Sequence, residues 1–334
     1  MRECGMLLPV ASLPSRYGIG AFSKEAYDFI DTLKAAGQSF WQILPLGPTG
    51  FGDSPYQSFS AFAGNPYFID LEKLAEEGLL TMQECLDADF GNDERDIDYK
   101  KIYDGRFPLL RKAYERWKEG RSPELVHELA GRKLGDETRE YCFYMAVKNH
   151  FDSCSWNLWD EGIRLRKPEA LESYRAMLTD EIGFYEFQQI KFEEQWDALK
   201  RYAHEQGIRI IGDIPIYVAF DSADSWSRPE LFQFDENNMP GAVAGCPPDG
   251  FSATGQLWGN PLYNWEYHRK TGYAWWMRRM EYCFCMYDLV RVLTSIMPYP
   301  TAMPRLSSAA GKRGRVLKYS GRCRSISAGT SCLS

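Results

Sequence analysis

The last 42 residues of this 334-residue chain, Leu293–Ser334, contain no Trp, Phe, Asp, Glu or His. They are rich in Ser and Gly and carry seven Arg or Lys residues. A segment with so little apolar surface cannot offset the entropy cost of ordering its backbone, which excludes a globular domain there. We therefore expect residues 293–334 to form a disordered tail.

The sequence also lacks a long apolar segment near its N-terminus and an excess of positive charge. The apolar run near the N-terminus, Met6–Leu8, is flanked by Pro9 and Pro14, so we expect neither a signal peptide nor a membrane span. The net charge of −7 gives no excess of positive charge, so no nucleic-acid partner is expected; the basic tail alone is typical of a short solvated segment.

The nine Cys residues are scattered, and none has the usual spacing of a zinc site. Cys283 and Cys285, for example, are separated by a single residue. We therefore expect no metal, and a reducing compartment, the cytoplasm, fits best.

The chain has ample material for a core. Its composition is 44% hydrophobic, enough to bury a large core in one or two domains. Aromatic residues make up 15%, which is high. Aromatic faces stack on sugar rings in carbohydrate clefts, but aromatic cores are the commoner use, and composition leaves both interpretations open.

Four short apolar segments predict buried strands. The stretch Ser23–Ala36 between the first two has helical spacing, with Ser23 as the expected N-cap and Gly37 as the stop. Strand–loop–helix–strand order is typical of parallel α/β folds. About four of the eight strands that close a (β/α)8 barrel are present, so we expect an incomplete (β/α)8 TIM barrel. The predicted strands are Gly5–Ala11, Phe40–Leu44, Ile208–Ile214 and Tyr287–Val292.

A long interior segment differs from the rest. From about Leu71 to Arg201 the chain is charged and mostly helical in period, as in Tyr141–His150 and Phe184–Tyr202. We interpret it as an inserted helical subdomain that forms a separate layer. The expected division is residues 1–70 for the first part of the barrel, 71–201 for the insert, 202–292 for the continued barrel and 293–334 for the tail.

Three loops after predicted strands carry polar and aromatic side chains. The first, Gly52–Ser58, offers donors and acceptors to a hydroxyl-rich ligand, or is a turn-rich loop that satisfies itself. Asp213 ends an apolar strand, where a carboxylate is catalytic, substrate-binding or a structural partner. The third lies in a long loop over residues 215–264, and its part from Gly245 to Tyr263 is a binding loop, or holds Trp258 for packing.

Together these stretches resemble the amylomaltase family, the 4-alpha-glucanotransferases or disproportionating enzymes. The similar text is SLPSRYGIG, FWQILPLGPTG, DSPYQSFSAFAGNPY, GDIPIYVAFDSADSW, GCPPDGFSATGQLWGNPLYNW and YDLVRV. The resemblance implies a (β/α)8 barrel and retaining transfer of α-1,4-glucan segments to a sugar 4-hydroxyl. An Asp nucleophile and a Glu acid/base would act in the two-carboxylate scheme, with no cofactor and with maltooligosaccharides as partners.

The resemblance also implies roles for residues of this chain. Ser54 and Tyr56 are expected to line the glucan subsites, and Asp213 to bind the sugar at the scissile end. Asp249, Gln256 and Trp258 are expected in the loop that covers the glucan. Arg291 is expected to pair with the nucleophile and to keep it ionised.

The chain departs from the family after Val292. The family continues Val-Arg-Ile-Asp-His-Phe-Arg-Gly, and its Asp is the nucleophile; here Leu293 stands in that place, and no acid/base Glu follows. A synonymous coding sequence for the family's Tyr-Tyr-Ala-Ile-Pro-Tyr-Gly-Asp-Ala, translated one base later, gives Ile-Met-Pro-Tyr-Pro-Thr-Ala-Met-Pro, which is residues 296–304. We therefore predict a frameshifted tail; a truncated paralogue with an unrelated tail is the alternative.

Three functions follow for this polypeptide. It is a 4-alpha-glucanotransferase by descent, a non-catalytic glucan-binding remnant, or an unstable truncated product. Loss of the nucleophile removes most of a rate enhancement, so we expect the chain as written to be inactive.

Overall fold

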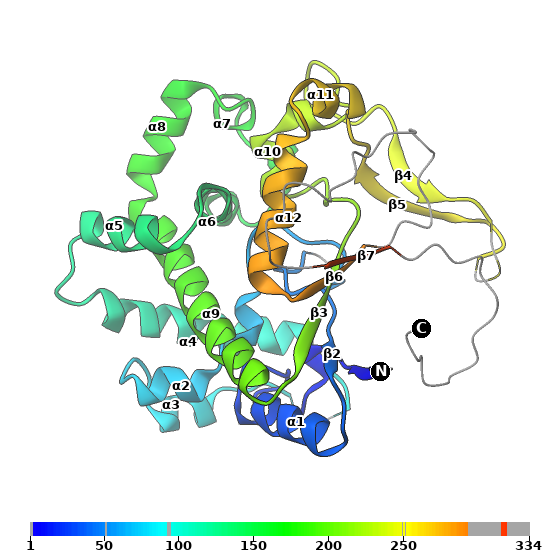
Figure 1. Ribbon diagram of the computed structural model, residues 1–334. Helices are drawn as coiled ribbons and strands as arrows, with labels where there is room; N and C mark the ends of the chain where they lie inside the picture. Colours follow the sequence, from blue (N-terminus) through cyan, green and yellow to red (C-terminus); the bar gives the residue numbers. More distant parts are fainter. Residues whose placement is uncertain are drawn as a thin grey trace.

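The computed structural model describes residues 3–50, 52–91, 95–248, 250 and 252–292, and the backbone of residues 315–318. Its centre is a parallel sheet with strand order β1-β2-β3-β6-β7 (Figure 1). The first four strands follow one another in sequence and in space, as successive strands of a (β/α)8 barrel do. The strands are β1 (Gly5–Leu7), β2 (Phe40–Gln42), β3 (Arg209–Ile214), β6 (Leu289–Val292) and β7 (Arg315–Lys318).

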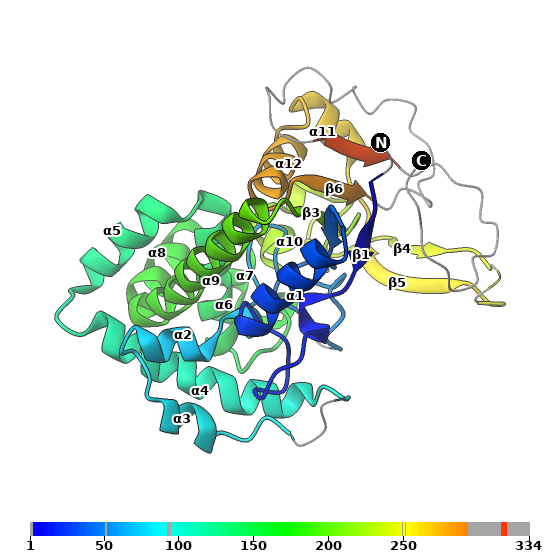
Figure 2. The same cartoon turned by 60° about the horizontal axis from the view of Figure 1, so that its bottom comes forward.

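The helices before β2, β3 and β6 complete the β/α alternation. They are α1 (Lys24–Ala35), α9 (Thr179–Glu205) and α12 (Ala274–Met286), and they lie on one side of the sheet (Figures 1 and 2). Fully buried side chains of the strands, among them Trp41, Ile210 and Val290, belong to the same hydrophobic core as these helices. The predicted α/β fold, a partial TIM barrel, is thereby confirmed.

Two glycines end helices, and one of them, Gly37, is the predicted stop. Gly37 follows α1 and Gly207 follows α9, with φ of 69° and 79°, a left-handed conformation that costs glycine little. Ser23 does occupy the N-cap of α1, but its hydroxyl donates to the Glu25 carboxylate at 2.5 Å and accepts no helix N–H.

The segment predicted as a helical insert is helical. Among its described residues, 71–91 and 95–201, the structure contains helices and no strand. Its helices are α2 (Leu71–Glu76), α3 (Met82–Asp87), α4 (Tyr99–Lys118), α5 (Pro123–Lys133), α6 (Asp136–His150), α7 (Glu161–Arg164), α8 (Pro168–Met177) and most of α9, with the 3-10 turn η3 (Trp156–Leu158).

The insert is joined to the barrel by α9. This 27-residue helix contacts α4, α5, α6 and α8 as well as α1 and β3. Two buried glutamines on it each hold a backbone amide group of the barrel: Gln189 exchanges two hydrogen bonds with Gly64, of 2.8 and 2.9 Å, and Gln195 two with Asp70, of 2.6 and 3.2 Å. One hydrophobic core therefore runs through both parts, and the division at residues 70, 201 and 292 stays a prediction.

The predicted long loop over residues 215–264 has more structure than expected. It contains α10 (Ala223–Ser227), η4 (Pro229–Leu231) and an antiparallel hairpin of β4 (Val243–Cys246) and β5 (Gln256–Pro261). Its glycines serve the hairpin: a Cβ on Gly245 would lie 2.5 Å from the Gln256 carbonyl oxygen, so only glycine permits this approach of the two strands. The remaining short elements are η1 (Val10–Ser12), η2 (Pro66–Phe68) and α11 (Trp265–Lys270).

The tail is described only at β7, which runs parallel to β6. At these four residues the backbone is regular, unlike the expectation for the tail, because β6 offers an edge for pairing. The prediction for the rest of residues 293–334 falls outside the described residues. Within the part of the chain that is described, no helix is long and apolar enough to cross a membrane.

Candidate functional site

A buried ion pair joins the carboxyl ends of β3 and β6. Asp213 and Arg291 are opposite each other in the strand register, so both side chains leave the same face of the sheet. The Arg291 guanidinium donates from Nε to Oδ1 of Asp213 at 3.1 Å and from Nη2 to Oδ2 at 2.6 Å. The Asp213 side chain is 0% exposed and that of Arg291 31%. This is the bidentate geometry that binds a carboxylate most strongly.

Tyr56 completes a group of three side chains. Its hydroxyl donates to Oδ2 of Asp213 at 2.8 Å, although the two residues are 157 positions apart in sequence. Burial, and then the hydrogen bond to Asp213, raise the pKa of Tyr56 to about 12, so the phenol stays a donor at neutral pH. The hydrogen bond to Asp213 raises the pKa of Arg291, which stays a cation. Arg291 was expected to pair with the nucleophile, whose place Leu293 takes in this sequence; in the structure its partner is Asp213.

Ser54 acts within its own loop. Its hydroxyl oxygen accepts from the Tyr56 N–H at 3.4 Å, and its carbonyl accepts from the Gln57 N–H at 3.0 Å. Both contacts close the turn, and the expected role of Ser54 in the glucan subsites stays a prediction. Its turn directs Tyr56 toward Asp213.

Gln256 and Trp258 lie together on β5. The Trp258 indole N–H donates to the Gln256 side-chain oxygen at 3.1 Å, and the Trp258 ring lies 6.4 Å from that of Tyr217. The neighbouring Leu257 is 81% exposed. Asp249, the other residue predicted for this segment, lies outside the described residues.

Two residues without a predicted role connect the hairpin to the Tyr56 loop. The Gln57 amide donates to the Asn260 side-chain oxygen at 3.1 Å and to the Trp258 carbonyl at 3.4 Å. Asn260 in turn donates to the Val218 carbonyl at 2.8 Å. The only sequence signal was the presence of two amide side chains inside polar loops, which does not say that they meet.

A small cavity lies next to Asp213. Its volume is about 50 Å³, and Tyr217 and Arg279 also line it. Arg279 is 2% exposed and donates to the Pro215 carbonyl at 2.5 Å and to the Tyr263 hydroxyl at 3.3 Å. The cavity has room for water but not for a sugar ring. A glucan would therefore have to lie over the strand ends.

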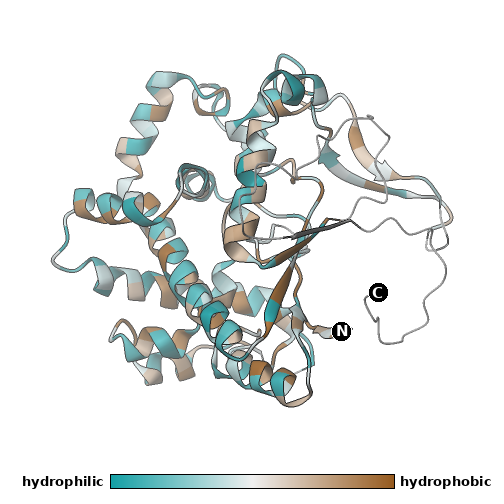
Figure 3. Cartoon of the chain, in the orientation of Figure 1, coloured by the Kyte–Doolittle hydropathy of each residue, from teal (hydrophilic) through white to brown (hydrophobic). Residues whose placement is uncertain are grey.

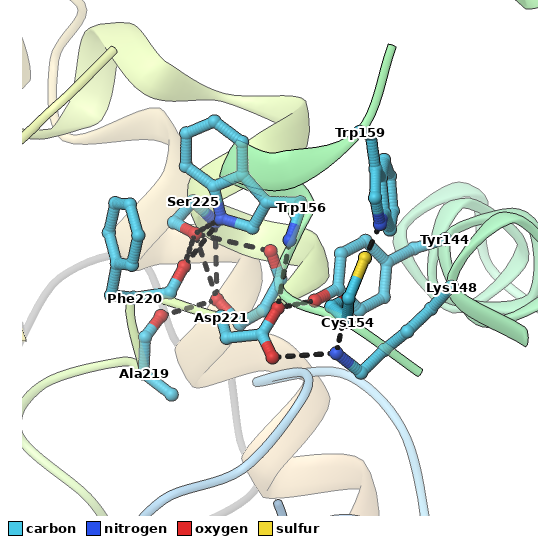
Figure 4. Close-up of polar contacts among 10 residues, drawn as sticks. Tyr144, Lys148, Cys154, Trp156, Trp159, Ala219, Phe220, Asp221 and Ser225 are labelled. Carbon is cyan, nitrogen blue, oxygen red and sulfur yellow. Dashed lines mark hydrogen bonds and ion pairs between the residues drawn. The ribbon is translucent and has the colours of Figure 1, made fainter. Parts of the chain in front are cut away.

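A second polar cluster ties the insert to the loop after β3 (Figure 4). Asp221 accepts from the Lys148 ammonium at 2.6 Å through Oδ2, and from the Tyr144 hydroxyl at 2.5 Å and the Trp156 N–H at 3.3 Å through Oδ1. Lys148 also donates to the Cys154 carbonyl at 3.0 Å. Through Asp221, helix α6 fixes the end of the loop that carries Tyr217.

The three side chains at the ends of β3 and β6 can form hydrogen bonds with a ligand. Asp213 offers acceptor oxygens, and Tyr56 and Arg291 offer donors, which suits the hydroxyls of a carbohydrate. A two-carboxylate mechanism also needs a nucleophile and an acid/base. Residues 293–334 contain no Asp or Glu, so the tail supplies neither.

The comparisons with known proteins agree on one family. The glycoside hydrolase 77 family, described as 4-alpha-glucanotransferase, matches residues 8–292. The 4-alpha-glucanotransferase of Streptococcus pneumoniae is 49% identical over 292 residues, which cover 87% of this chain and 58% of that enzyme. That of Thermus thermophilus is 46% identical over 293 residues, with the same two coverages. The chain thus spans well under two thirds of the length of these relatives.

Solved structures give the same result. An amylomaltase from Streptococcus agalactiae in complex with acarbose is similar over 88% of this chain and 59% of that chain, with a TM-score of 0.84 and 43% identity. An amylomaltase from Corynebacterium glutamicum matches 87% of this chain and 40% of that chain with a TM-score of 0.65 at 20% identity, a likeness of fold alone.

Proposed function

Because this chain belongs to the 4-alpha-glucanotransferase family, we propose that it binds α-1,4-glucans at the carboxyl ends of β3 and β6. We further propose that its fold is built for retaining transfer of glucan segments to a sugar 4-hydroxyl, and that the chain as written does not complete this reaction. The observation that carries the proposal is the buried contact of Asp213 with both Arg291 and Tyr56.

The proposed roles follow from this geometry. Asp213 is proposed to bind the sugar at the scissile end; because its side chain is 0% exposed here and is held by Arg291 and Tyr56, the glucan must first open the strand ends that these two residues cover. Trp258, next to Tyr217, offers an aromatic face for a sugar ring, and Gln256 an amide for its hydroxyls. Ser54 shapes the turn under Tyr56, and we keep Asp249 as a subsite residue on the resemblance alone.

The chain lacks the nucleophile that a retaining transfer requires. A retaining transfer passes through a glycosyl-enzyme, which needs a carboxylate nucleophile on the face of the sheet that carries Arg291. Leu293 stands two residues after Arg291, where the family has that Asp. An alkyl side chain has no lone pair with which to attack the anomeric carbon. Bound glucan would therefore leave unchanged.

Binding and turnover are measured separately. Isothermal titration of the full chain with maltoheptaose is expected to give heat of binding, whereas cellohexaose, which has β-1,4 links, is not. Trp258→Ala is expected to weaken maltoheptaose binding about fivefold, through loss of roughly 1 kcal/mol of ring contact. Leu158→Ala, a change at a 69% exposed residue of the insert, serves as the control.

Incubation with maltotriose is expected to release no glucose above the blank. Steady glucose release would contradict the proposed inactivity, and equal binding of the two glucans would contradict the site. A chain that does not fold, the third alternative, would show neither a cooperative thermal transition nor a shift of it by maltoheptaose.

We also propose that the chain resides in a reducing compartment and that its tail arises from a frameshift. Seven cysteines of the described residues are free, which supports a reducing compartment such as the cytoplasm.

DNA sequencing across the Val292 codon tests the frameshift. An alternative frame that encodes family-like sequence would support the frameshift, and the absence of such a frame would favour an unrelated tail.

A further inference from the structure

Side chains from other elements hold the chain where it leaves β3. Residues 215–218 belong to no helix or strand. Arg279 of α12 donates from Nη2 to the Pro215 carbonyl at 2.5 Å, and the Tyr263 hydroxyl donates to the Ile216 carbonyl at 2.9 Å. Arg279 also donates from Nη1 to the Tyr263 hydroxyl at 3.3 Å, which joins the two contacts. The path of the chain after β3 is therefore set by α12 and by the residues that follow β5.

Tyr217 is the side chain that this arrangement orients. Its ring is nearly parallel to that of Tyr263, with centroids 5.9 Å apart and planes 13° apart, and the Trp258 ring lies 6.4 Å away. Tyr217 is partly exposed and lines the cavity next to Asp213. Its hydroxyl has no hydrogen-bond partner among the described residues. Such a side chain can stack on a sugar ring and hydrogen-bond to it.

Arg279 is an unusual residue for its position in α12, along which hydrophobic and hydrophilic residues are mixed (Figure 3). It is 2% exposed and forms no ion pair with a described residue, whereas its neighbour Arg278 pairs with Glu137 of α6. Its buried Nε has no hydrogen-bond partner in the described part of the chain. A buried cation without a carboxylate partner costs free energy. The hydrogen bonds to the chain after β3 are therefore what distinguishes Arg279 from an apolar residue.

We propose that Arg279 is a positioning residue of the glucan site, which holds the chain after β3 so that Tyr217 presents its ring and hydroxyl to a sugar. Arg279 itself touches no glucan, because it is buried; it acts through the Pro215 carbonyl and through Tyr263. This inference rests on the proposed function, since it assigns a further residue to the same site.

Titration with maltoheptaose in two backgrounds tests this role. Arg279→Met removes the donors and keeps an unbranched apolar side chain, and it is expected to weaken binding about tenfold. In a Tyr217→Ala background the same substitution is expected to change the affinity less than about twofold, because the ring that Arg279 orients is gone. A loss of equal size in both backgrounds would overturn the proposal, since a purely structural role does not depend on Tyr217.

Two further variants keep the proposal testable if Arg279→Met does not fold. Tyr263→Phe keeps the ring beside Tyr217 and removes only the hydroxyl that joins Arg279 to the Ile216 carbonyl. It is expected to keep a cooperative thermal transition and to weaken binding about threefold, and parent-like affinity would overturn the proposal. Arg279→Lys is expected to weaken binding less than Arg279→Met, because an ammonium still donates to a carbonyl.

The matched control is Arg278→Met, which breaks the pair with Glu137 one residue away on α12 and is expected to leave the affinity unchanged. Equal losses of affinity in Arg278→Met and Arg279→Met would overturn the inference. If the parent binds maltoheptaose and Arg279→Met binds it equally well, the inference fails and the proposed function stands. If the parent itself does not bind maltoheptaose, the proposed function fails and the inference fails with it.

Discussion

At the scale of single residues, the Asp213 carboxylate depends on Arg291 for its charge balance. Arg291→Ala leaves a fully buried carboxylate with Tyr56 as its remaining described partner, and we expect the free energy of unfolding to fall by about 3 kcal/mol. Arg291→Lys is expected to recover only part of this free energy, because an ammonium cannot donate two parallel hydrogen bonds to the carboxylate as a guanidinium does. Urea unfolding followed by tryptophan fluorescence measures both.

The control for this series is Lys24→Ala, which removes the exposed pair of Lys24 with Asp28 on α1. Its unfolding midpoint is expected to match the parent, because solvent screens such a pair. An unfolding midpoint of Arg291→Ala equal to that of Lys24→Ala would show that the Arg291–Asp213 ion pair does not stabilise the fold.

Asp224 makes stability depend on pH. Burial raises its pKa to about 6, while its Oδ2 accepts from the Ala61 N–H at 2.8 Å and the nearby charges of Arg279 and Glu137 act in opposite directions. Since the folded state holds this proton more tightly than the unfolded state, its contribution is present below about pH 4 and is lost as pH rises to about 6.

Asp224→Asn keeps an acceptor for Ala61 and removes the titration. Relative to the parent, the variant is therefore expected to gain about 2–3 kcal/mol between pH 4 and pH 7. Unfolding by urea at pH 4, 5, 6 and 7 checks this. Parallel stability curves for the two proteins would show that Asp224 does not titrate in this range.

At the scale of elements, the contact between α6 and the loop after β3 is an ion pair with unequal burial. The Lys148 side chain is 5% exposed and that of Asp221 32%. A double-mutant cycle with Lys148→Met and Asp221→Asn is expected to give a coupling energy of about 1–3 kcal/mol. Lys148→Met is also expected to speed amide exchange in residues 215–222, since the end of that loop loses its anchor.

The comparison variant is Lys167→Met, which breaks the exposed pair with Glu161 in the same insert. Faster exchange of residues 215–222 in this variant too would mean that the loop senses general destabilisation and not the Lys148 contact.

The β4–β5 hairpin depends on close backbone approach at Gly245. Gly245→Ala places a Cβ 2.5 Å from the Gln256 carbonyl oxygen, and we expect the hairpin to lose about 1–3 kcal/mol. Gly241→Ala meets no atom within 4 Å and is the matched control. Amide exchange of residues 256–261 measures the opening of the hairpin, and unchanged exchange in Gly245→Ala would contradict the assigned strand pairing.

At the scale of the whole molecule, insert and barrel are expected to unfold together. They share one core, and α9 holds the barrel backbone at Gly64 through Gln189. Gln189→Leu leaves a buried N–H and a buried carbonyl without this partner, so stability is expected to fall by about 2–4 kcal/mol while the transition stays single. Separate transitions for the insert and the sheet in the parent would contradict a shared core.

Much of the architecture could be predicted because its signals are local. Apolar runs such as Ile208–Ile214 and helical spacing such as Phe184–Tyr202 depend on neighbouring residues, as do the helix stops at Gly37 and Gly207. Because side chains alternate between the two faces of a strand, the local sequence also decides which neighbours share a face with Arg291. The β4–β5 hairpin was missed because its Gly and Pro residues indicate loops unless the partner strand is known.

The sequence by itself determined the positions of the four parallel strands, the helical insert, the likeness to glucanotransferases and the lack of a carboxylate after Val292. Only the tertiary structure decided that Asp213 would hold Arg291 and Tyr56, that Gln57 would meet Asn260, and that α9 would fuse insert and barrel into one core. These contacts join residues from 78 to 203 positions apart. Strand register and helix packing bring such residues together, and neither is encoded in the residues next to them.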